Sequence, residues 1–430
     1  MKKSFIPRFA DTAALFDQQL AGLKWTIAHA YYGSSFYRQH FEEAGVFPRD
    51  ITSLGDLFRL PFTTGKDLKE GYPFPLLSVP ERDVVRIHAS SGTTGKRKVL
   101  AYTQKDLDDW FDMFARCYEM AGVTPKDRVQ IAVGYGVWTA GMGFQLGCER
   151  LGAMAIPVGP GNIDMQCRFL LDLQSTVFCC TASMALLMAE EINKRGIKDK
   201  INLKKIIMGS ERCSDAMRTK ICDLIGLEDI FDITGMTELY GPGTGIDCPK
   251  HEGIHYWADK YILEILDPDT LMPVKEGQIG EMVVTTLYKE ASPLIRYRTR
   301  DLTRKITRQC SCGSLLFMHD RILGRSDDMI ILKGVNIYPG QIDEVLSTIP
   351  EAGSEYQLHL ERKEDGRESM TIKAEAAEGF DIAQIKDIQT KIRKLVHSKI
   401  MVSCDADICA YGDLPRYPGK ARRIFDNRRE

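Results

Sequence analysis

The sequence has no long hydrophobic run and no excess of one charge. No stretch approaches the ~18 apolar residues that a membrane-spanning helix needs, so no transmembrane segment is expected. Two lysines follow the first methionine, but Arg8 and Asp11 interrupt the apolar stretch after them, which argues against a signal peptide and predicts a cytoplasmic protein. The 57 Lys and Arg residues nearly balance the 59 Asp and Glu residues. Nucleic-acid-binding proteins normally carry a strong basic excess, so no nucleic-acid partner is expected.

Internal repeats, low-complexity tracts and polar linkers are also absent, and the cysteines form little pattern. The chain contains 12 cysteines, most of them scattered. In a reducing cytoplasm we expect them to be thiols that pack like small apolar side chains, except for one cluster near residue 310. The chain has 430 residues, more than the roughly 250–300 at which a single core stops growing, so at least two domains are expected.

Strand-like and helical segments alternate from Lys105 to Arg308. Short apolar runs such as DRVQIAV, GAMAIPV and TVFCCTA are separated by helical patterns such as MALLMAEEINKR. This alternation predicts an α/β domain with a mainly parallel sheet. The segment KYILEILDPDTLMPVKEGQIGEMVVTTL instead has apolar runs joined by Asp-Pro-Asp and Lys-Glu-Gly-Gln turns, which predicts an antiparallel β segment.

A smaller α+β unit is predicted at the C-terminal end. The pattern restarts after GRSDDMIILKGVNIYP, and DIQTKIRKLVHSKI has the apolar spacing of an amphipathic helix. We place the boundary near Asp327, which gives a large domain of residues 1–326 and a small domain of residues 327–430, joined by a hinge. The first 60 residues are predicted to be helices with loops.

The most distinctive stretch is SSGTTGK, which consists of Ser90, Ser91, Gly92, Thr93, Thr94, Gly95 and Lys96. Hydroxyls and glycine amides donate hydrogen bonds and a lysine supplies charge, so the stretch suits phosphate oxygens. A Walker A loop needs four residues between its glycines and a Ser or Thr after its lysine, whereas here two residues separate the glycines and Arg97 follows the lysine. A P-loop NTPase is therefore disfavoured. Alone, the stretch is equally compatible with an ordinary polar surface turn.

Five motifs in a fixed order resemble those of the adenylate-forming superfamily, which contains acyl-CoA synthetases, luciferases and peptide-synthetase adenylation domains. SSGTTGK is similar to its phosphate-binding loop, TGMTE (234–238) to its adenine and magnesium motif, and YRTRDL (297–302) to its ribose motif. GRSDDMIILKGVNIYP (324–339) is similar to its hinge motif and PRYPGKARR (415–423) to its catalytic-lysine motif. Within the superfamily, GYGVWTAGMGF, ERLGAMAIPVGPGN and GPGTGIDCPKHEGIH resemble the phenylacetate–coenzyme A ligase branch.

This resemblance implies a two-step reaction. A carboxylate attacks the α-phosphate of ATP, and the thiol of coenzyme A then displaces AMP from the acyl-adenylate. Glu238 and Lys420 are the implied catalytic residues, the first as the Mg²⁺ ligand and the second as the cation that stabilises the α-phosphate and the carboxylate. Asp301 is implied to bind the ribose hydroxyls, and Arg325 to reach the nucleotide from the hinge. The plainer alternatives are a solvated loop glutamate, an exposed lysine in a basic tail, and a salt bridge from Asp301 to a flanking arginine.

Further nucleotide contacts are implied around the adenine. The expected positions are Gly209, Ser210, Glu211, Asp232, Thr234, Gly235, Met236 and Thr237. The sequence departs from the family pattern at Thr234, where an aromatic residue usually stacks on the adenine. Other groups must hold the base, which bears on the affinity for ATP more than on the identity of the nucleotide.

The segment GYGVWTAGMGF is expected to line the acyl pocket, with Tyr135 and Gly136 as the candidate residues. Small residues leave room for a ligand, and the side chains of Tyr135, Trp138 and Phe144 offer aromatic walls. This combination favours a flat aryl acid. The alternative is an ordinary glycine-rich turn that packs a strand against a helix.

One cysteine cluster departs from the scattered pattern. Cys310 and Cys312 form a C-x-C pair, and CPKHEGIH upstream contains Cys248, His251 and His255. Soft thiolates and imidazoles suit a tetrahedral zinc site. We expect Cys248, His255, Cys310 and Cys312 to hold a structural Zn²⁺, with His251 as the alternative nitrogen ligand. Unmetallated thiols on neighbouring loops are the other interpretation.

The favoured function is therefore an ATP-dependent, AMP-forming ligase that joins an aryl acid such as phenylacetate to coenzyme A, with ATP/AMP, Mg²⁺, coenzyme A and structural Zn²⁺ as its cofactors. One alternative is an adenylating enzyme whose acceptor is an amine or a carrier thiol. Another is a nucleotide-binding protein without catalysis, against which the presence of Glu238, Asp301 and Lys420 argues. The resemblance also implies a homodimer and a rotation of the small domain about the hinge residue Asp327 between the two steps.

Overall fold

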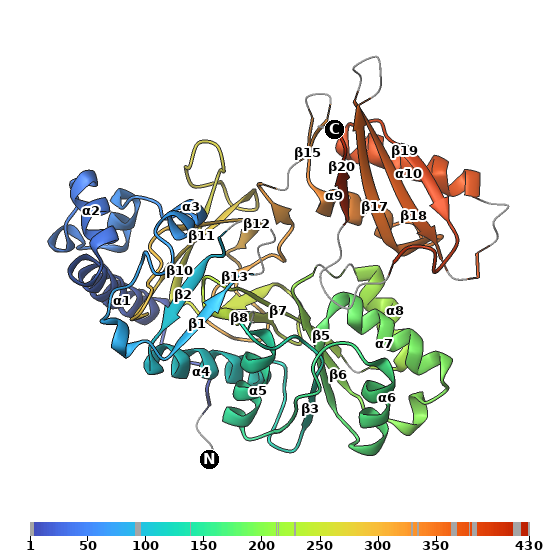
Figure 1. The fold of residues 1–430 in the computed structure, drawn as a ribbon, viewed down its shortest axis with the longest axis horizontal. Helices are drawn as coiled ribbons and strands as arrows, with labels where there is room; N and C mark the ends of the chain where they lie inside the picture. The colour runs from blue at the N-terminus through green and yellow to red at the C-terminus, as the bar shows by residue number, and fades with distance from the viewer. Residues whose placement is uncertain are drawn as a thin grey trace. The chain divides into compact units, whose positions relative to one another are not determined.

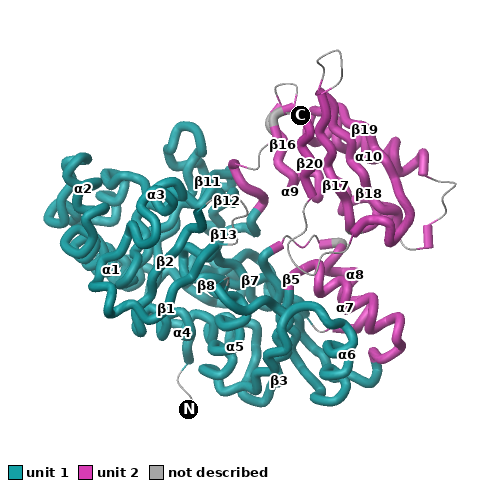
Figure 2. The backbone as a smooth tube through the Cα atoms, in the orientation of Figure 1, with its two compact units in different colours: residues 1–180, 199–210, 228–322 teal, residues 181–198, 211–227, 323–430 magenta. Residues whose placement is uncertain are grey.

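The structure, a computed structural model, describes residues 4–90, 96–137, 139–211, 213, 215–227, 229–327, 330–332, 335–362, 368–377, 379–380, 385–415 and 423–428. The chain forms two compact units (Figures 1 and 2). The first contains residues 1–180, 199–210 and 228–322, and the second contains residues 181–198, 211–227 and 323–430. Among the described residues, no helix is both long and apolar enough to cross a membrane. The boundary between residues 326 and 327 stays a prediction.

The first unit contains six α-helices among its described residues: α1 (Thr12–Gly33), α2 (Ser35–Ala44), α3 (Gly65–Glu70), α4 (Gln104–Met120), α5 (Ala140–Leu151) and α6 (Ile163–Asp172). Its strands are β1 (Arg86–Ala89), β2 (Val99–Tyr102), β3 (Arg128–Ile131), β4 (Met154–Ile156), β5 (Val177–Thr181), β6 (Lys205–Gly209), β7 (Asp229–Met236), β8 (Gly241–Asp247), β9 (Ile254–Tyr256), β10 (Tyr261–Leu266), β11 (Ile279–Thr286), β12 (Tyr297–Ile306) and β13 (Met318–His319).

One large sheet runs through this unit in the order β10-β11-β12-β13-β9-β8-β7-β6-β5-β3-β4. Strand β3 pairs in parallel with β4 and β5, and β6 pairs in parallel with β7. From β7 to β10 all neighbouring strands in this order are antiparallel. The predicted α/β fold with an added antiparallel segment is confirmed. The antiparallel part begins earlier than we predicted, because the glycine-rich GPGTGID, to which we assigned no element, forms strand β8.

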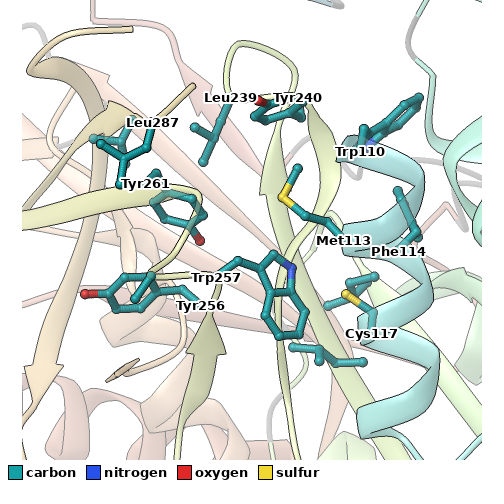
Figure 3. Packing of buried hydrophobic residues seen from close by; sticks show 14 of the residues in the cluster. Trp110, Met113, Phe114, Cys117, Leu239, Tyr240, Tyr256, Trp257, Tyr261 and Leu287 are labelled. Atoms are coloured by element: carbon teal, nitrogen blue, oxygen red, sulfur yellow. The ribbon is translucent and has the colours of Figure 1, made fainter. Parts of the chain in front are cut away.

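The main core of the first unit packs against one face of α4 (Figure 3). Trp110, Met113, Phe114 and Cys117 follow helical spacing, and each is at most 1% exposed. Figure 3 shows them facing Trp257 and its neighbours across the core. Burial of these large side chains positions α4, and with it the strands that carry the candidate site.

Glycines allow other elements to approach α4 closely. A Cβ atom on Gly143 of α5 or on Gly243 of β8 would collide with the Phe114 ring, and one on Gly147 of α5 would collide with the Cβ atom of Phe114. Phe144 is 3% exposed, and its ring centre lies 5.1 Å from that of Phe114. This half of GYGVWTAGMGF therefore packs as the alternative interpretation predicted, and Phe144 is a core residue.

The start of α4 also anchors a distant loop. Thr103 Oγ1 accepts a hydrogen bond from Asp106 N at 3.2 Å, and Asp106 Oδ2 accepts one from Thr103 N at 3.1 Å, which is a capping box. The carboxylate of Asp106 accepts two further bonds, from the amides of Glu290 and Ala291, at 2.7 and 2.9 Å. Asp106 is fully buried, so residues 289–291 are tied firmly to the helix.

The second unit has its own core. Its described helices are α7 (Ala182–Lys194), α8 (Asp215–Ile225), α9 (Pro339–Ser347) and α10 (Ile385–Ile400), and its strands are β14 (Gly324–Arg325), β15 (Ile330–Leu332), β16 (Val335–Ile337), β17 (Ala352–Arg362), β18 (Glu368–Ala376), β19 (Asp405–Cys409) and β20 (Ile424–Asp426). A four-stranded sheet has the order β19-β18-β17-β20, with an antiparallel central pair and parallel outer pairs. The predicted small α+β unit is confirmed, and in α10 the buried residues recur every four positions at Ile388, Ile392, Val396 and Ile400.

Candidate functional site

The base of the predicted phosphate loop is held by the antiparallel pair β1 and β2. Ser90 N donates to Lys98 O at 3.0 Å, and Lys98 N donates to Ser90 Oγ at 3.2 Å. Lys96 is exposed, with its Nζ atom 5.6 Å from the centre of the Tyr72 ring. The middle of the loop lies outside the described residues, namely Ser91, Gly92, Thr93, Thr94 and Gly95.

Glu238 is the point at which three of the motifs meet. Its carboxylate is buried, with the residue 7% exposed. Tyr297 Oη, from the ribose motif, donates to Glu238 Oε1 at 3.1 Å, and Lys98 Nζ, from the end of the phosphate loop, forms an ion pair with the same oxygen. Lys98 Nζ also donates to Tyr297 Oη at 3.5 Å. The predicted phosphate, magnesium and ribose motifs are thus neighbours around one carboxylate.

Two side chains, those of Tyr102 and Lys289, hold the backbone carbonyls at Glu238 and the residue before it. Tyr102 Oη donates to Thr237 O at 3.3 Å, and Lys289 Nζ donates to Glu238 O at 3.4 Å. Lys289 is fully buried, with its Nζ atom 4.5 Å from the centre of the Tyr102 ring and 4.9 Å from that of Tyr240. Burial lowers the pKa of Lys289 to about 8, and the nearby carboxylates of Asp106 and Glu238 oppose this shift.

A buried histidine supports the same segment. The carbonyl of Tyr240 can only accept a hydrogen bond, so His88 Nδ1 donates to it, at 2.7 Å. Burial lowers the pKa of His88 to about 3, which keeps the imidazole neutral. Among the described residues, neither His88 Nε2 nor Tyr240 Oη has a hydrogen-bond partner. The ring of His88 packs 4.0 Å from Tyr102 between centres.

The predicted adenine segments lie on adjacent parallel strands. Gly209 ends β6 beside Ile233 of β7, and a Cβ atom at Gly209 would collide with the Ile233 carbonyl. Gly235 has a φ of +156° and similarly approaches the Gly241 carbonyl. Ser210 follows with a φ of +69°, in the left-handed region. Close strand packing therefore requires both glycines, whatever ligand lies above them.

The other adenine candidates have identifiable contacts. Glu211 Oε2 accepts bonds from Ser183 N and Oγ at 2.9 and 2.5 Å, at the N-terminus of α7, where a helix favours negative charge. Asp232 N donates to Asp247 Oδ1 at 2.7 Å. Thr234 O accepts a bond from Thr244 Oγ1 at 3.4 Å, while Met236 packs against the core and Thr237 has the backbone contact given above.

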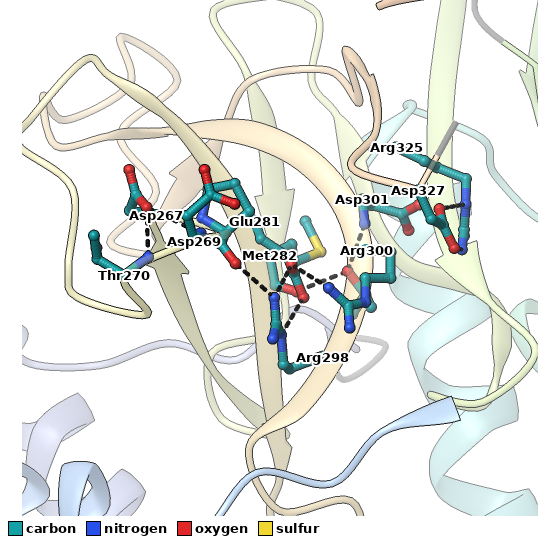
Figure 4. Close-up of polar contacts among 12 residues, drawn as sticks. Asp267, Asp269, Thr270, Glu281, Met282, Arg298, Arg300, Asp301, Arg325 and Asp327 are labelled. Atoms are coloured by element: carbon teal, nitrogen blue, oxygen red, sulfur yellow. Dashed lines mark hydrogen bonds and ion pairs between the residues drawn. The ribbon is translucent and has the colours of Figure 1, made fainter. Parts of the chain in front are cut away.

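The ribose candidate Asp301 lies on β12 beside two arginines (Figure 4). Arg298 donates to both oxygens of Glu281, at 3.0 and 2.7 Å, and Arg300 approaches Glu281 Oε2 at 3.5 Å. Asp301 N donates to Thr299 Oγ1 at 3.0 Å. The flanking arginines both contact Glu281, and the role of Asp301 stays a prediction.

The hinge candidates are bound to each other. Arg325 donates from Nε and Nη2 to the two carboxylate oxygens of Asp327, each at 2.9 Å (Figure 4). The hinge motif forms the hairpin β15–β16 in its described part. Lys420, the predicted catalytic lysine, lies outside the described residues.

The acyl-pocket candidates follow β3. Tyr135 Oη is buried and has no hydrogen-bond partner among the described residues, and burial raises the pKa of Tyr135 to about 12. Gly136 has a φ of +98°, and a Cβ atom there would meet no other atom within 4 Å. The tyrosine ring packs against Gly141, where a Cβ atom would approach to 2.6 Å. Open space beside Gly136 and an unpaired buried hydroxyl are compatible with a ligand at this loop.

The structure brings the predicted zinc ligands together. One ligand atom from each of Cys248, His255, Cys310 and Cys312 lies within 4.8 Å of the others. The Sγ atoms of Cys248 and Cys310 are 3.6 Å apart, and Cys312 Sγ is 3.5 Å from His255 Nε2. His255 Nδ1 donates to Leu316 O at 3.4 Å, which leaves the lone pair on Nε2 facing the thiols.

The alternative nitrogen ligand, His251, has other partners. Its Nδ1 atom lies 2.7 Å from Asp247 Oδ2 and its Nε2 atom 2.8 Å from Asp229 Oδ1. These two carboxylates raise the pKa of His251 to about 9. Both ring nitrogens are thus engaged with carboxylates, and His251 is not part of the cluster.

Comparison with known proteins gives matches that cover almost the whole chain. The model of the family described as AMP-binding enzyme matches residues 48–287, and that of the AMP-binding enzyme C-terminal domain matches residues 334–428. The phenylacetate-coenzyme A ligase of Escherichia coli (strain K12) is 39% identical over 416 residues, which are 95% of this chain and 94% of that protein. The chain belongs to the phenylacetate–coenzyme A ligase family. The phenylacetate-coenzyme A ligase of Pseudomonas putida is 38% identical over 97% of this chain and 95% of that protein.

Solved structures agree with this family. A crystal structure of 2-hydroxyisobutyryl-CoA ligase, in the postadenylation state with 2-HIB-AMP, matches with a TM-score of 0.90 and 26% identity over 98% of this chain and 91% of that chain. The resemblance to adenylate-forming acid–thiol ligases is therefore confirmed for the fold and for the family.

Sequence reasoning gave no role to several residues of this ligase site. Tyr297 begins the ribose motif and Lys98 lies two residues after the phosphate motif, but nothing in the sequence shows that both side chains reach Glu238. Lys289 lies outside every motif, and its only signal is a lone lysine between the apolar segments 282–287 and 291–295. These contacts depend on how distant strands are placed side by side.

Proposed function

We propose that this protein is an ATP-dependent, AMP-forming ligase that converts an aryl acid such as phenylacetate into its coenzyme A thioester through an acyl-adenylate. The observation that carries the proposal is the meeting of the phosphate, magnesium and ribose motifs at Glu238, in a chain 37–39% identical to phenylacetate-coenzyme A ligases of three bacteria over most of its length. Because Lys98 lies two residues after the phosphate motif and Tyr297 begins the ribose motif, their shared contact is evidence for one composite nucleotide site.

The proposed first step joins two anions. A carboxylate oxygen of the acid attacks the α-phosphorus of ATP, and the bond from that phosphorus to the bridging oxygen breaks to release pyrophosphate. Lys420 is proposed to stabilise the charge at the α-phosphate, and residues 90–96 to bind the phosphates. Asp301 is proposed to accept bonds from the ribose hydroxyls, and Gly209–Glu211 and residues 232–237 to flank the adenine.

Magnesium fits the residues at Glu238. The Oε1 atom of its carboxylate is occupied by Lys98 and Tyr297, whereas Oε2 has no hydrogen-bond partner among the described residues and is not sealed from solvent. A hard divalent cation prefers such a carboxylate oxygen, and Mg²⁺ supplies positive charge to the phosphates when it is bound. Glu238 is therefore proposed as its protein ligand.

The proposed second step forms the thioester. The sulfur of coenzyme A attacks the acyl carbon, the bond from that carbon to the phosphate oxygen breaks, and AMP leaves while the thiol proton passes to solvent. The small domain, proposed as residues 327–430, is expected to move about Asp327 between the steps. The ion pair between Arg325 and Asp327 lies at the residue about which this movement is proposed.

The division of labour between the steps can be tested at Lys420. Lys420→Ala should abolish formation of acyl-adenylate and pyrophosphate from ATP and acid, while thioester formation from synthetic acyl-adenylate should be largely retained. Both half-reactions are measured separately by chromatography. Equal losses in both would contradict the proposed role.

Tyr135 and Gly136 are proposed to contact the acid. The unpaired Tyr135 hydroxyl and the open space at Gly136 support this placement, and an aromatic wall favours an aryl acid. A short hydroxy acid is the second candidate substrate class, because the structural likeness to 2-hydroxyisobutyryl-CoA ligase extends over 98% of the chain. A cytoplasmic location and a homodimer remain predictions.

Structural zinc is proposed at Cys248, His255, Cys310 and Cys312. Burial raises the pKa of Cys248 to about 12 and lowers that of His255, so a metal must displace the thiol proton of Cys248, whereas His255 offers a neutral imidazole. The four ligands leave no open position, which suits a structural role. Metal content should fall to background in Cys310→Ser/Cys312→Ser, with Cys409→Ser as a matched control. Equal zinc in both variants would contradict the assignment.

The decisive experiment is a product analysis. Purified protein is mixed with Mg-ATP, coenzyme A and phenylacetate, and products are identified by mass spectrometry. AMP with phenylacetyl-coenzyme A supports the proposal, and AMP with the thioester of another acid from a panel of aryl and short hydroxy acids corrects only the substrate. No AMP with any acid would contradict the proposed function, and Glu238→Gln provides the inactive control.

A further inference from the structure

The carboxylate of Glu238 is held in an asymmetric way. Both of its side-chain partners, Lys98 Nζ and Tyr297 Oη, contact Oε1. Among the described residues, no donor contacts Oε2. Lys98 Nζ also donates a hydrogen bond to Tyr297 Oη at 3.5 Å. Each of the three groups, Lys98 Nζ, Tyr297 Oη and Glu238 Oε1, therefore contacts the other two.

The ion pair between Glu281 and Arg298, in the same unit, has a different hydrogen-bond geometry. Glu281 is 1% exposed, and Arg298 contacts both of its oxygens, at 3.0 and 2.7 Å. A buried carboxylate gains most when both oxygens are satisfied, because an unpaired charge away from water is costly. The side chain of Glu238 is more exposed, at 9%, and among the described residues its Oε2 atom has no donor and is not sealed from solvent, so this oxygen is available to a ligand.

We propose that Lys98 and Tyr297 are positioning residues that fix the Glu238 carboxylate, so that Oε2 alone is presented to the divalent cation of the bound nucleotide. The proposal rests on the proposed function, because that function assigns the cation to Glu238. Lys98 supplies the compensating charge for a buried carboxylate, and Tyr297 fixes its orientation through a hydrogen bond.

The backbone contacts make this positioning effective. Tyr102 and Lys289 hold the carbonyls of Thr237 and Glu238, so the main chain at this point is fixed independently of the side chain. With the main chain fixed, two donors on Oε1 restrict the remaining rotation of the carboxylate. Mg²⁺ demands near-ideal octahedral geometry, so a pre-oriented oxygen should bind it more tightly than a rotating one.

Tyr297→Phe is the sharpest test, because it removes one oxygen atom from a residue that is 2% exposed. Tyr240→Phe is the matched control, since Tyr240 is fully buried two residues from Glu238 and its hydroxyl has no hydrogen-bond partner among the described residues. Binding of Mn²⁺ to the protein with α,β-methylene-ATP, in the absence of acid, is followed by electron paramagnetic resonance of the unbound ion. This readout needs no turnover.

We expect Tyr297→Phe to weaken Mn²⁺ binding about tenfold, the effect of one hydrogen bond to a charged group, and Tyr240→Phe to leave it unchanged. Lys98→Met should weaken it as well, and Lys98→Arg should retain most of the affinity. Because Tyr297 acts through Glu238, adding Tyr297→Phe to Glu238→Gln should cause no further loss. Circular dichroism and melting temperature establish that each variant is folded, and the Lys98 pair keeps the test available if Tyr297→Phe does not fold.

The outcomes separate the two proposals. If Glu238→Gln weakens Mn²⁺ binding but Tyr297→Phe and Lys98→Met do not, the positioning role is refuted and the proposed function stands. Tighter Mn²⁺ binding in Lys98→Met would also refute it, because Lys98 would then be a competitor of the metal. If Glu238→Gln has no effect, the magnesium assignment fails and the positioning role fails with it.

Discussion

The contrast between Arg298 and Arg300 gives a quantitative prediction. Both arginines lie on β12 and contact the same carboxylate of Glu281 (Figure 4). The side chain of Arg298 is 12% exposed and makes two hydrogen bonds to Glu281, whereas that of Arg300 is 38% exposed and lies at 3.5 Å. The two substitutions Arg298→Met and Arg300→Met therefore remove the same charge from one strand in different environments.

Arg298→Met removes both of these hydrogen bonds from a carboxylate that is 1% exposed. Breaking a buried ion pair by removing one member costs about 3–5 kcal/mol. An exposed ion pair contributes only about 0–1 kcal/mol, so Arg300→Met should be nearly neutral. At about 2 °C per kcal/mol for a unit of this size, the melting temperature should fall by about 6–10 °C in the first variant and by at most about 2 °C in the second.

Differential scanning calorimetry measures both variants, and urea denaturation gives the free energy of unfolding. Because Asp301 follows on the same strand, the KM for ATP should rise in Arg298→Met at temperatures where the variant is folded. Equal destabilisation by both variants, or a larger effect of Arg300→Met, would refute the reasoning that burial and bidentate geometry decide the energy of this cluster.

Two further predictions concern stability and packing. The pKa of His251 is raised from its ordinary value of 6.5 to about 9, so the stability it contributes is fully present below pH 6.5 and is lost as the pH rises through 9; after screening we expect about 1–2 kcal/mol, and urea denaturation from pH 6 to 10 should show a flatter profile for His251→Gln. Gly143→Ala should destabilise the chain by about 1–3 kcal/mol because its Cβ atom would collide with the Phe114 ring, whereas Gly55→Ala, whose Cβ atom meets only Ser53 Oγ at 3.5 Å, should cost under about 1 kcal/mol; equal urea midpoints would contradict this account.

Much of the fold could be predicted from the sequence because its elements are defined by local patterns. The apolar runs that became β3 and β5 are short and continuous, which is typical of strands buried on both faces, and almost all of their residues are buried. Asp267 explains the turn between β10 and β11, because its carboxylate accepts bonds from the amides of Asp269 and Thr270 at 3.0 and 2.8 Å. Strand β8 was missed because its glycines are required by close approach to α4, a tertiary requirement.

In the candidate site, too, local sequence determined some features and the tertiary structure determined others. The motif sequences determined the family and the set of residues around the nucleotide, because each motif is a continuous segment. Only the tertiary structure showed that Lys98 and Tyr297 share one oxygen of Glu238, and that the buried Lys289 holds the adjacent carbonyl. These pairs are separated by long stretches of chain, so their contact depends on strand order and register.

The four residues of the proposed zinc site also show what the sequence and the fold each determine. The sequence by itself indicated Cys248, His255, Cys310 and Cys312 as candidate ligands, with His251 as the alternative nitrogen ligand. The choice between the two histidines was decided by the fold. Pairing of β9 with β13 places His255 opposite Met318, beside the thiols, while His251 precedes the strand and turns to Asp229 and Asp247. Residue type limits which chemistry is available, and strand register decides which side chains meet.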